Sequence, residues 1–125
     1  MSLFARQLFA LSLALFAAFA QAQTSKPIQI IVPVAAGGGT DLLARTLGQK
    51  LGEALNQTVL VENKLGAGGN IGVEFVAKAK PDGLTLLVSP ATIATNVAVY
   101  RTLPYDLLKD LTAVSLIAQT RSEER

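Results

Sequence analysis

The sequence contains no cysteine and no histidine among its 125 residues. Disulfide bonds are therefore excluded, and so are metal sites built on thiolate or imidazole ligands and triads that depend on histidine. A serine in such a chain lacks the histidine base that usually activates it as a nucleophile. Since no other catalytic constellation emerges from the sequence, we predict that the chain is not an enzyme and holds neither a metal ion nor a cofactor.

Charge is also scarce. Charged residues make up 16% of the sequence, against roughly 25% in a typical globular protein. The 11 basic and 9 acidic residues give a formal net charge of +2, and the basic residues are scattered along the chain. A chain of this kind lacks the clustered basic stripe that binds a phosphate backbone, so we predict that nucleic acid is not a partner.

Residues 1–22 have the pattern of a secretory signal peptide. Arg6 and the amino terminus form a short positive region, and residues 8–20 form an apolar run. This run is shorter than the roughly 20 residues that span a bilayer, and Ala20-Gln21-Ala22 is a small-x-small cleavage site. We therefore predict export, with cleavage after Ala22. The alternatives are a membrane anchor and a buried helix.

The following residues, 23–118, alternate between β-branched runs and amphipathic segments. We predict strands at 27–34, 58–62, 84–88 and 112–118, and helices at 41–55, 71–79 and 91–100. Thr40 and Asn70 are the expected N-caps of the first two helices. Such alternation with short links is typical of an α/β protein with a parallel sheet covered on both faces. The polar residues 119–125 have no periodicity and form an atypical tail.

A glycine-rich loop follows each of the first two predicted strands. In an open parallel sheet, such loops lie outside the carboxyl ends of the strands, where ligands bind. Each loop also precedes a helix whose first N–H groups are unpaired and lie at the positive end of the helix dipole. We therefore predict a carboxylate or phosphate site at these loops. The alternative is that the glycines only form tight turns.

No phosphate-binding motif is complete. A GxxxxGK[ST] run is absent, and Gly37 and Gly39 match only the first two glycines of GxGxxG because Leu42 takes the third place. The second loop misses the motif in the same way. Glu62, at the end of the second predicted strand, has the position of a ribose-binding acid. A nucleotide-binding oxidoreductase fragment with a glycine-rich βα turn therefore stays the alternative function.

Four motifs in order resemble the tripartite tricarboxylate transporter substrate-binding receptors, also called the Bordetella uptake gene family. The motifs are IIVPVAAGGGTDLLAR at 30–45, VENKLGAGGNIG at 61–72, VAKAKPDGLTLL at 76–87 and LPYDLLKDLTAVSLI at 103–117. The resemblance implies a periplasmic-binding-protein-like α/β fold with two lobes and a ligand between them. Residues 23–118 would be most of the first lobe, so the resemblance implies an N-terminal fragment. A departure is Val34-Ala35, where the family usually has Phe-Pro.

The resemblance also implies a function. A receptor of this family captures small carboxylates in the periplasm, such as tricarboxylates, dicarboxylates or similar organic acids, and passes them to a two-component membrane permease. The implied ligand-binding residues are Ala36, Gly37, Gly38, Gly39, Thr40, Asp41, Gly66, Ala67, Gly68, Gly69, Asn70 and Ser89. The carboxylate of Asp41 would repel an anion, so we expect it to orient the loop or to bind a ligand amino group or water. A truncated product that binds weakly or has no function is a further alternative, because half a cleft buries less of a ligand.

Overall fold

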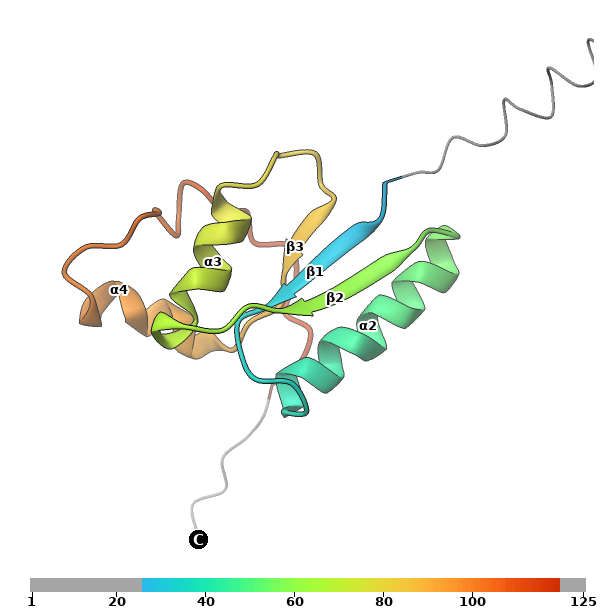
Figure 1. Ribbon diagram of the computed structural model, residues 1–125, viewed down its shortest axis with the longest axis horizontal. Coiled ribbons are helices and arrows are strands. Elements are labelled where there is room, and N and C mark those ends of the chain that lie inside the picture. Colours follow the sequence, from blue (N-terminus) through green and yellow to red (C-terminus); the bar gives the residue numbers. More distant parts are fainter. Residues whose placement is uncertain (1–25, 120–125) are drawn as a thin grey trace, which may run out of the picture.

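The computed structural model describes residues 26–119 as a three-stranded parallel sheet with helices on both faces (Figure 1). The predicted signal peptide, its cleavage site and positions 120–125 of the predicted tail lie outside the described residues. The strands are β1 (Ile28–Val32), β2 (Val59–Asn63) and β3 (Thr85–Leu87). The α-helices are α2 (Gly39–Leu55), α3 (Asn70–Ala77) and α4 (Asn96–Val99), and the 3-10 helices are η2 (Ala67–Gly69) and η3 (Ala91–Thr95).

Strand β1 lies at the centre of the sheet, in the order β2-β1-β3, and pairs in parallel with both neighbours. In this register Ile30 lies opposite Val61 of β2 and Leu86 of β3. Side chains of a strand alternate between the two faces of the sheet, and both faces of β1 are covered. Both Ile30 and Ile31 are therefore fully buried, and every residue of β1 except the half-buried Gln29 is apolar.

Each face of the sheet has its own hydrophobic cluster. On the face covered by α2, the buried residues are Ile30, Val32, Ala44 and Val88. On the opposite face, α3 and the chain that follows β3 contribute Val73, Ile93 and Tyr105. Figure 1 shows α2 and α3 on either side of the strands. The predicted α/β class with helices on both faces of a parallel sheet is therefore confirmed.

Two predicted elements are wrong. The helix predicted at 91–100 is the 3-10 helix η3 followed by the short α4, because β-branched residues such as Thr92, Thr95 and Val97 favour an α-helix poorly. The strand predicted at 112–118 is absent, and that segment has no regular secondary structure. The side chains of Val114 and Leu116 are 85% and 79% exposed, since nothing among the described residues covers them.

No helix within residues 26–119 has the length and apolar character needed to cross a membrane. The apolar run at 8–20, on which the export prediction depends, lies outside this range.

Candidate functional site

The carboxyl ends of all three strands meet at one edge of the sheet, because the strands are parallel. The loop after β1 occupies residues 33–38, the loop after β2 begins at residue 64, and the chain after β3 begins at residue 88. Both glycine-rich loops therefore lie at the same edge (Figure 1). Ser89 follows β3 at this edge. This is the grouping that the sequence predicts.

The first glycine loop is exposed and leads directly into α2. Helix α2 begins at Gly39, with Gly38 as its N-cap, so the prediction of Thr40 as the N-cap is wrong. The backbone of Gly38 is extended, at φ −80° and ψ 169°, and its carbonyl accepts a 3.0 Å hydrogen bond from the N–H of Leu42. Gly39 and Thr40 therefore lie in the first turn, where backbone N–H groups have no partner within the helix.

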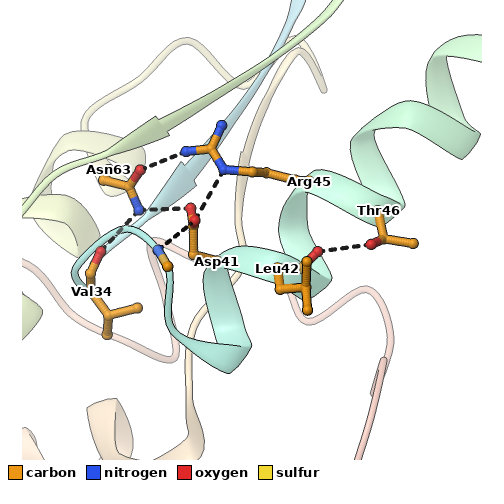
Figure 2. Close-up of polar contacts among 7 residues, drawn as sticks. Val34, Asp41, Leu42, Arg45, Thr46 and Asn63 are labelled. Carbon is orange, nitrogen blue, oxygen red and sulfur yellow. Dashed lines mark hydrogen bonds and ion pairs between the residues drawn. The ribbon is translucent and has the colours of Figure 1, made fainter.

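Asp41 anchors this loop from the first turn of α2. The residue is 3% exposed, and its carboxylate accepts three hydrogen bonds (Figure 2). The donors are the N–H of Gly37 at 2.9 Å, Nε of Arg45 at 3.0 Å and Nδ2 of Asn63 at 3.0 Å. The predicted loop-orienting contact of Asp41 is therefore present in the structure, and the Gly37 N–H is occupied by it.

Asn63 connects this network to both strands. Its Nδ2 also donates to the carbonyl of Val34, at 3.0 Å, and its Oδ1 accepts a bond from Nη2 of Arg45, at 3.0 Å (Figure 2). Asn63 is the last residue of β2, and Val34 follows β1. The end of β2 and the loop after β1 are therefore joined by side-chain hydrogen bonds.

The Asp41 carboxylate is a stable anion in this network. The hydrogen bond from Arg45 is the main cause, followed by those from Gly37 and Asn63, and together they lower the pKa of Asp41 to about 2. The guanidinium of Arg45 balances its charge in a 3.0 Å ion pair. The negative charge that Asp41 places beside the loop is therefore balanced.

The second glycine loop has an unusual backbone. Four successive residues have positive φ: Gly66 at 121°, Ala67 at 48°, Gly68 at 64° and Gly69 at 93°. Three of them are glycine, which adopts such angles without steric cost, whereas Ala67 is held in a left-handed conformation that alanine rarely adopts. One bond inside the loop, from the N–H of Gly69 to the carbonyl of Gly66 at 2.9 Å, helps to close it.

Asn70 has a different role from the predicted one. The N-cap of α3 is Gly69, so the prediction of Asn70 as the cap is wrong, because the left-handed turn ends one residue earlier. The Oδ1 of Asn70 instead accepts hydrogen bonds from the hydroxyl of Tyr105, at 2.7 Å, and from Nδ2 of Asn96, at 2.8 Å. Within residues 26–119 its own Nδ2 has no hydrogen-bond acceptor.

The remaining predicted residues differ in accessibility. Ala36, Gly37 and Gly38 of the first loop are exposed, and so is Ser89. In the second loop the backbone changes from exposed at Gly68 to buried at Gly69. Across the described residues no group of three His, Cys, Asp or Glu side chains is arranged to hold a metal ion.

Sequence reasoning missed four residues that support the loops: Arg45, Asn63, Asn96 and Tyr105. Arg45 lies four residues after Asp41 on the same helix, a spacing that favours an ion pair and is readable from the sequence. Tyr105 belongs to the fourth motif, although that motif does not indicate its contact with Asn70. The contacts of Asn63 and Asn96 depend on tertiary structure alone.

Glu62 is the acidic residue on which the nucleotide-binding alternative depends, and its carboxylate already has partners within the protein. Glu62 accepts a 2.7 Å hydrogen bond from Nε2 of Gln29 through one oxygen and forms a 2.5 Å ion pair with Lys64 through the other. The bond from Lys64 is the main cause that lowers the pKa of Glu62. A carboxylate held in this way is poorly placed to bind a ribose hydroxyl.

The sequence matches known proteins along most of its length. The model of a family described as tripartite tricarboxylate transporter family receptor matches residues 43–122. A UPF0065 protein of Agrobacterium vitis is 47% identical over 103 residues, which cover 80% of this chain and 30% of the relative. Protein BugT of Bordetella pertussis is 44% identical over 95 residues, which cover 74% of this chain and 29% of BugT. The chain thus spans about 30% of the length of these curated relatives.

Solved structures with the same fold include two with bound organic acids. The R. palustris protein Rpa4515 with adipate has a TM-score of 0.62 and 38% identity, over 67% of this chain and 28% of that protein. MatC of Rhodopseudomonas palustris with bound malate has a TM-score of 0.60 and 38% identity, over 67% of this chain and 29% of that protein. A structure described as a periplasmic transporter has a TM-score of 0.59 and 47% identity, over 70% of this chain and 30% of that chain.

Proposed function

The chain belongs to the tripartite tricarboxylate transporter receptor family, and we propose that it forms one wall of a periplasmic site for a small organic acid. Members of this family are solute-binding receptors, which agrees at the level of the family with a role that is not enzymatic. The observation that carries the proposal is the position of two glycine-rich loops at one edge of the sheet, each beside a network that fixes its backbone.

Unpaired donors support the binding of a carboxylate at the first loop. The N–H groups of Gly39 and Thr40 have no intrahelical partner, and α2 directs the positive end of its dipole toward them. The Thr40 hydroxyl is a further donor within the same turn. A carboxylate oxygen gains charge-assisted hydrogen bonds at such a terminus.

The second loop supports the same ligand chemistry. Asn70 Nδ2 is a donor without an acceptor among the described residues, and the loop that precedes it is glycine-rich and largely exposed. Ser89, which follows β3 at the same edge, adds an exposed hydroxyl. The bound acids of two structural neighbours, adipate and malate, are both dicarboxylates, which makes dicarboxylates the first ligands to test.

The wider role follows from the family. We propose that the chain is exported, with cleavage after Ala22, and that the receptor of which it forms a part delivers its ligand to a two-component membrane permease. The matched relatives are about three times as long as the matched region, so the second wall of the site corresponds to the remaining part of those relatives.

The proposal is tested by titrating the protein with malate, adipate and citrate while recording amide proton–nitrogen NMR spectra. We expect saturable shifts at the amides of residues 38–41 and 66–70. The matched control ligand is adipamide, which has the length of adipate but carries no charge and is expected to cause no saturable shift. Saturable binding of NADH with no response to any acid would instead support the nucleotide alternative and overturn the proposal.

A further inference from the structure

The second glycine loop needs support from outside itself. Its four successive positive φ angles include that of Ala67, and a strained backbone of this kind persists only when surrounding contacts hold it. The loop supplies just two of the required bonds, from the N–H of Gly69 to Gly66 and from the N–H of Asn70 to Ala67. The side-chain hydrogen bonds to residues 66–70 come from residues 91–105, which are distant in the sequence.

Asn96 and Tyr105 supply those contacts. Nδ2 of Asn96 donates to the carbonyl of Gly68 at 3.0 Å and to Oδ1 of Asn70 at 2.8 Å. The hydroxyl of Tyr105 donates to the same Oδ1 at 2.7 Å. Two donors therefore converge on one side of the Asn70 amide, and this fixes which side is the carbonyl and which is the NH2 group.

Hydrophobic packing fixes the position of Tyr105. Its side chain is 8% exposed and packs in a cluster with Val73 of α3 and Ile93 of η3. Leu103 and Leu107, on either side of it in the sequence, pack against the same cluster. The segment that contains the fourth sequence motif is thereby attached to α3, and the tyrosine hydroxyl reaches the first residue of that helix.

We propose that Tyr105 and Asn96 are positioning residues of the organic-acid site, which hold Asn70 so that its NH2 group is presented to the ligand. The inference rests on the proposed function and adds to it two residues outside both glycine loops. Asn96 also occupies the Gly68 carbonyl, whose partial negative charge would otherwise repel a carboxylate. Burial, together with Glu74 and Tyr100, raises the pKa of Tyr105, so its hydroxyl keeps the proton that it donates.

The test compares Tyr105→Phe with Tyr100→Phe in the full chain. Tyr100 is the matched control, because its hydroxyl also lies near Gly68 but donates no hydrogen bond to a described residue. Tyr105→Phe is expected to weaken malate or adipate binding about tenfold, the effect of one lost hydrogen bond of this kind, and Tyr100→Phe to leave it unchanged. Asn96→Ala is a second variant that is expected to weaken binding by a similar factor.

A double-mutant cycle separates positioning from general stability. If Tyr105 acts through Asn70, then Tyr105→Phe causes no further loss of affinity once Asn70→Ala is present. An equal loss in both backgrounds, or no loss in the wild-type background, overturns the inference.

A measurement without ligand keeps this inference distinct from the proposed function. Hydrogen exchange of the amides at 66–70 is expected to be about tenfold faster in Tyr105→Phe than in wild type, and unchanged in Tyr100→Phe. If the wild-type protein binds neither acid, the proposed function fails, and amide exchange alone then decides whether Tyr105 positions Asn70. Unchanged exchange in Tyr105→Phe means that it does not.

Discussion

The N–H of Gly37 donates a 2.9 Å hydrogen bond to the Asp41 carboxylate, so the first glycine loop is held by the acidic residue of the helix that it precedes. Gly37 has φ of 87°, and the bond stabilises this left-handed turn. The carboxylate therefore lies beside the proposed anion site without contributing an unbalanced charge to it, because Arg45 pairs with it.

Substitution of Asp41 by asparagine is expected to lower the melting temperature by several degrees and to weaken organic-acid binding. An asparagine accepts bonds through only one oxygen and turns its NH2 group toward donors such as Gly37 N–H or Arg45. Thermal unfolding followed by circular dichroism measures the first effect. The matched control is Glu53→Gln on the same helix, where an exposed ion pair with Lys50 contributes little. Equal melting temperatures for the two variants would contradict the assigned role of Asp41.

The stability contributed by Asp41 depends on pH in a defined direction. Its pKa is about 2 in the folded chain, against 3.8 for a free aspartate. A lowered pKa means that the contribution is complete above about pH 4 and is lost as the pH falls toward 2. The difference in melting temperature between wild type and Asp41→Asn is therefore expected to shrink over this interval. A difference that stays constant down to pH 2 would show that the charge of Asp41 does not stabilise the fold.

The proposed contact between the Gly39 N–H and the ligand can be tested by a substitution that removes this backbone donor. Proline is well accepted at the first position of a helix, and the extended backbone of Gly38 suits the residue before a proline. Gly39→Pro is expected to weaken acid binding about tenfold if this N–H contacts the ligand, with little change in melting temperature. Gly39→Ala keeps the N–H, and its Cβ meets nothing within 4 Å, so it is expected to bind more tightly than the proline variant. Equal affinities would exclude the Gly39 N–H as a ligand contact.

Position 69 requires glycine for two reasons: its backbone φ angle is positive, and neighbouring atoms leave no room for a Cβ. A Cβ there would lie 2.7 Å from Cδ1 of Ile93 and 3.3 Å from the carbonyl of Pro33, at φ of 93°. We expect Gly69→Ala to lower the free energy of unfolding by about 2–4 kcal/mol, the sum of strain and overpacking. At Gly83, where φ is 76° but the space is open, the same change is expected to cost only about 1 kcal/mol. Urea unfolding compares the two variants, and equal costs would mean that crowding at position 69 is unimportant.

The exposed apolar residues near the end of the described chain are expected to tolerate polar substitution. Leu116 is 79% exposed, so Leu116→Ser should change the free energy of unfolding by less than about 0.5 kcal/mol. Ile30→Ala, at a fully buried position of β1, should lower it by about 2–5 kcal/mol. Urea unfolding is again the measurement, and a large loss in Leu116→Ser would reveal a contact of this side chain that the structure lacks.

Much of the fold was predictable because local pattern and tertiary structure agree over residues 26–90. The β-branched run at β1 and the amphipathic pattern of α2 each predict what the structure contains. The sequence pattern gives a wrong prediction where tertiary contacts decide the secondary structure. The segment with Val114 and Leu116 has the composition of a strand, but a strand forms only with a neighbour to pair with, and sequence alone does not provide one.

The position of the candidate site was also predictable from the sequence, whereas its detailed contacts were not. Glycine loops at the ends of parallel strands follow from the order of elements, and so the sequence places them together. The N-cap predictions for Thr40 and Asn70 failed because glycines with extended or left-handed backbones took the cap positions. The support from Asn63, Asn96 and Tyr105 could not be predicted, since each contact joins residues that are 18 or more positions apart.

The second loop is held by side chains of the protein and so has its shape before any ligand arrives. The conformational entropy of four left-handed residues is lost when the chain folds, so under the proposed function an incoming acid does not have to order them again. A preorganised wall of this kind favours rapid capture, because association does not wait for a loop to rearrange. Under the proposed function, selectivity among acids of different length would then depend on the opposite wall of the site.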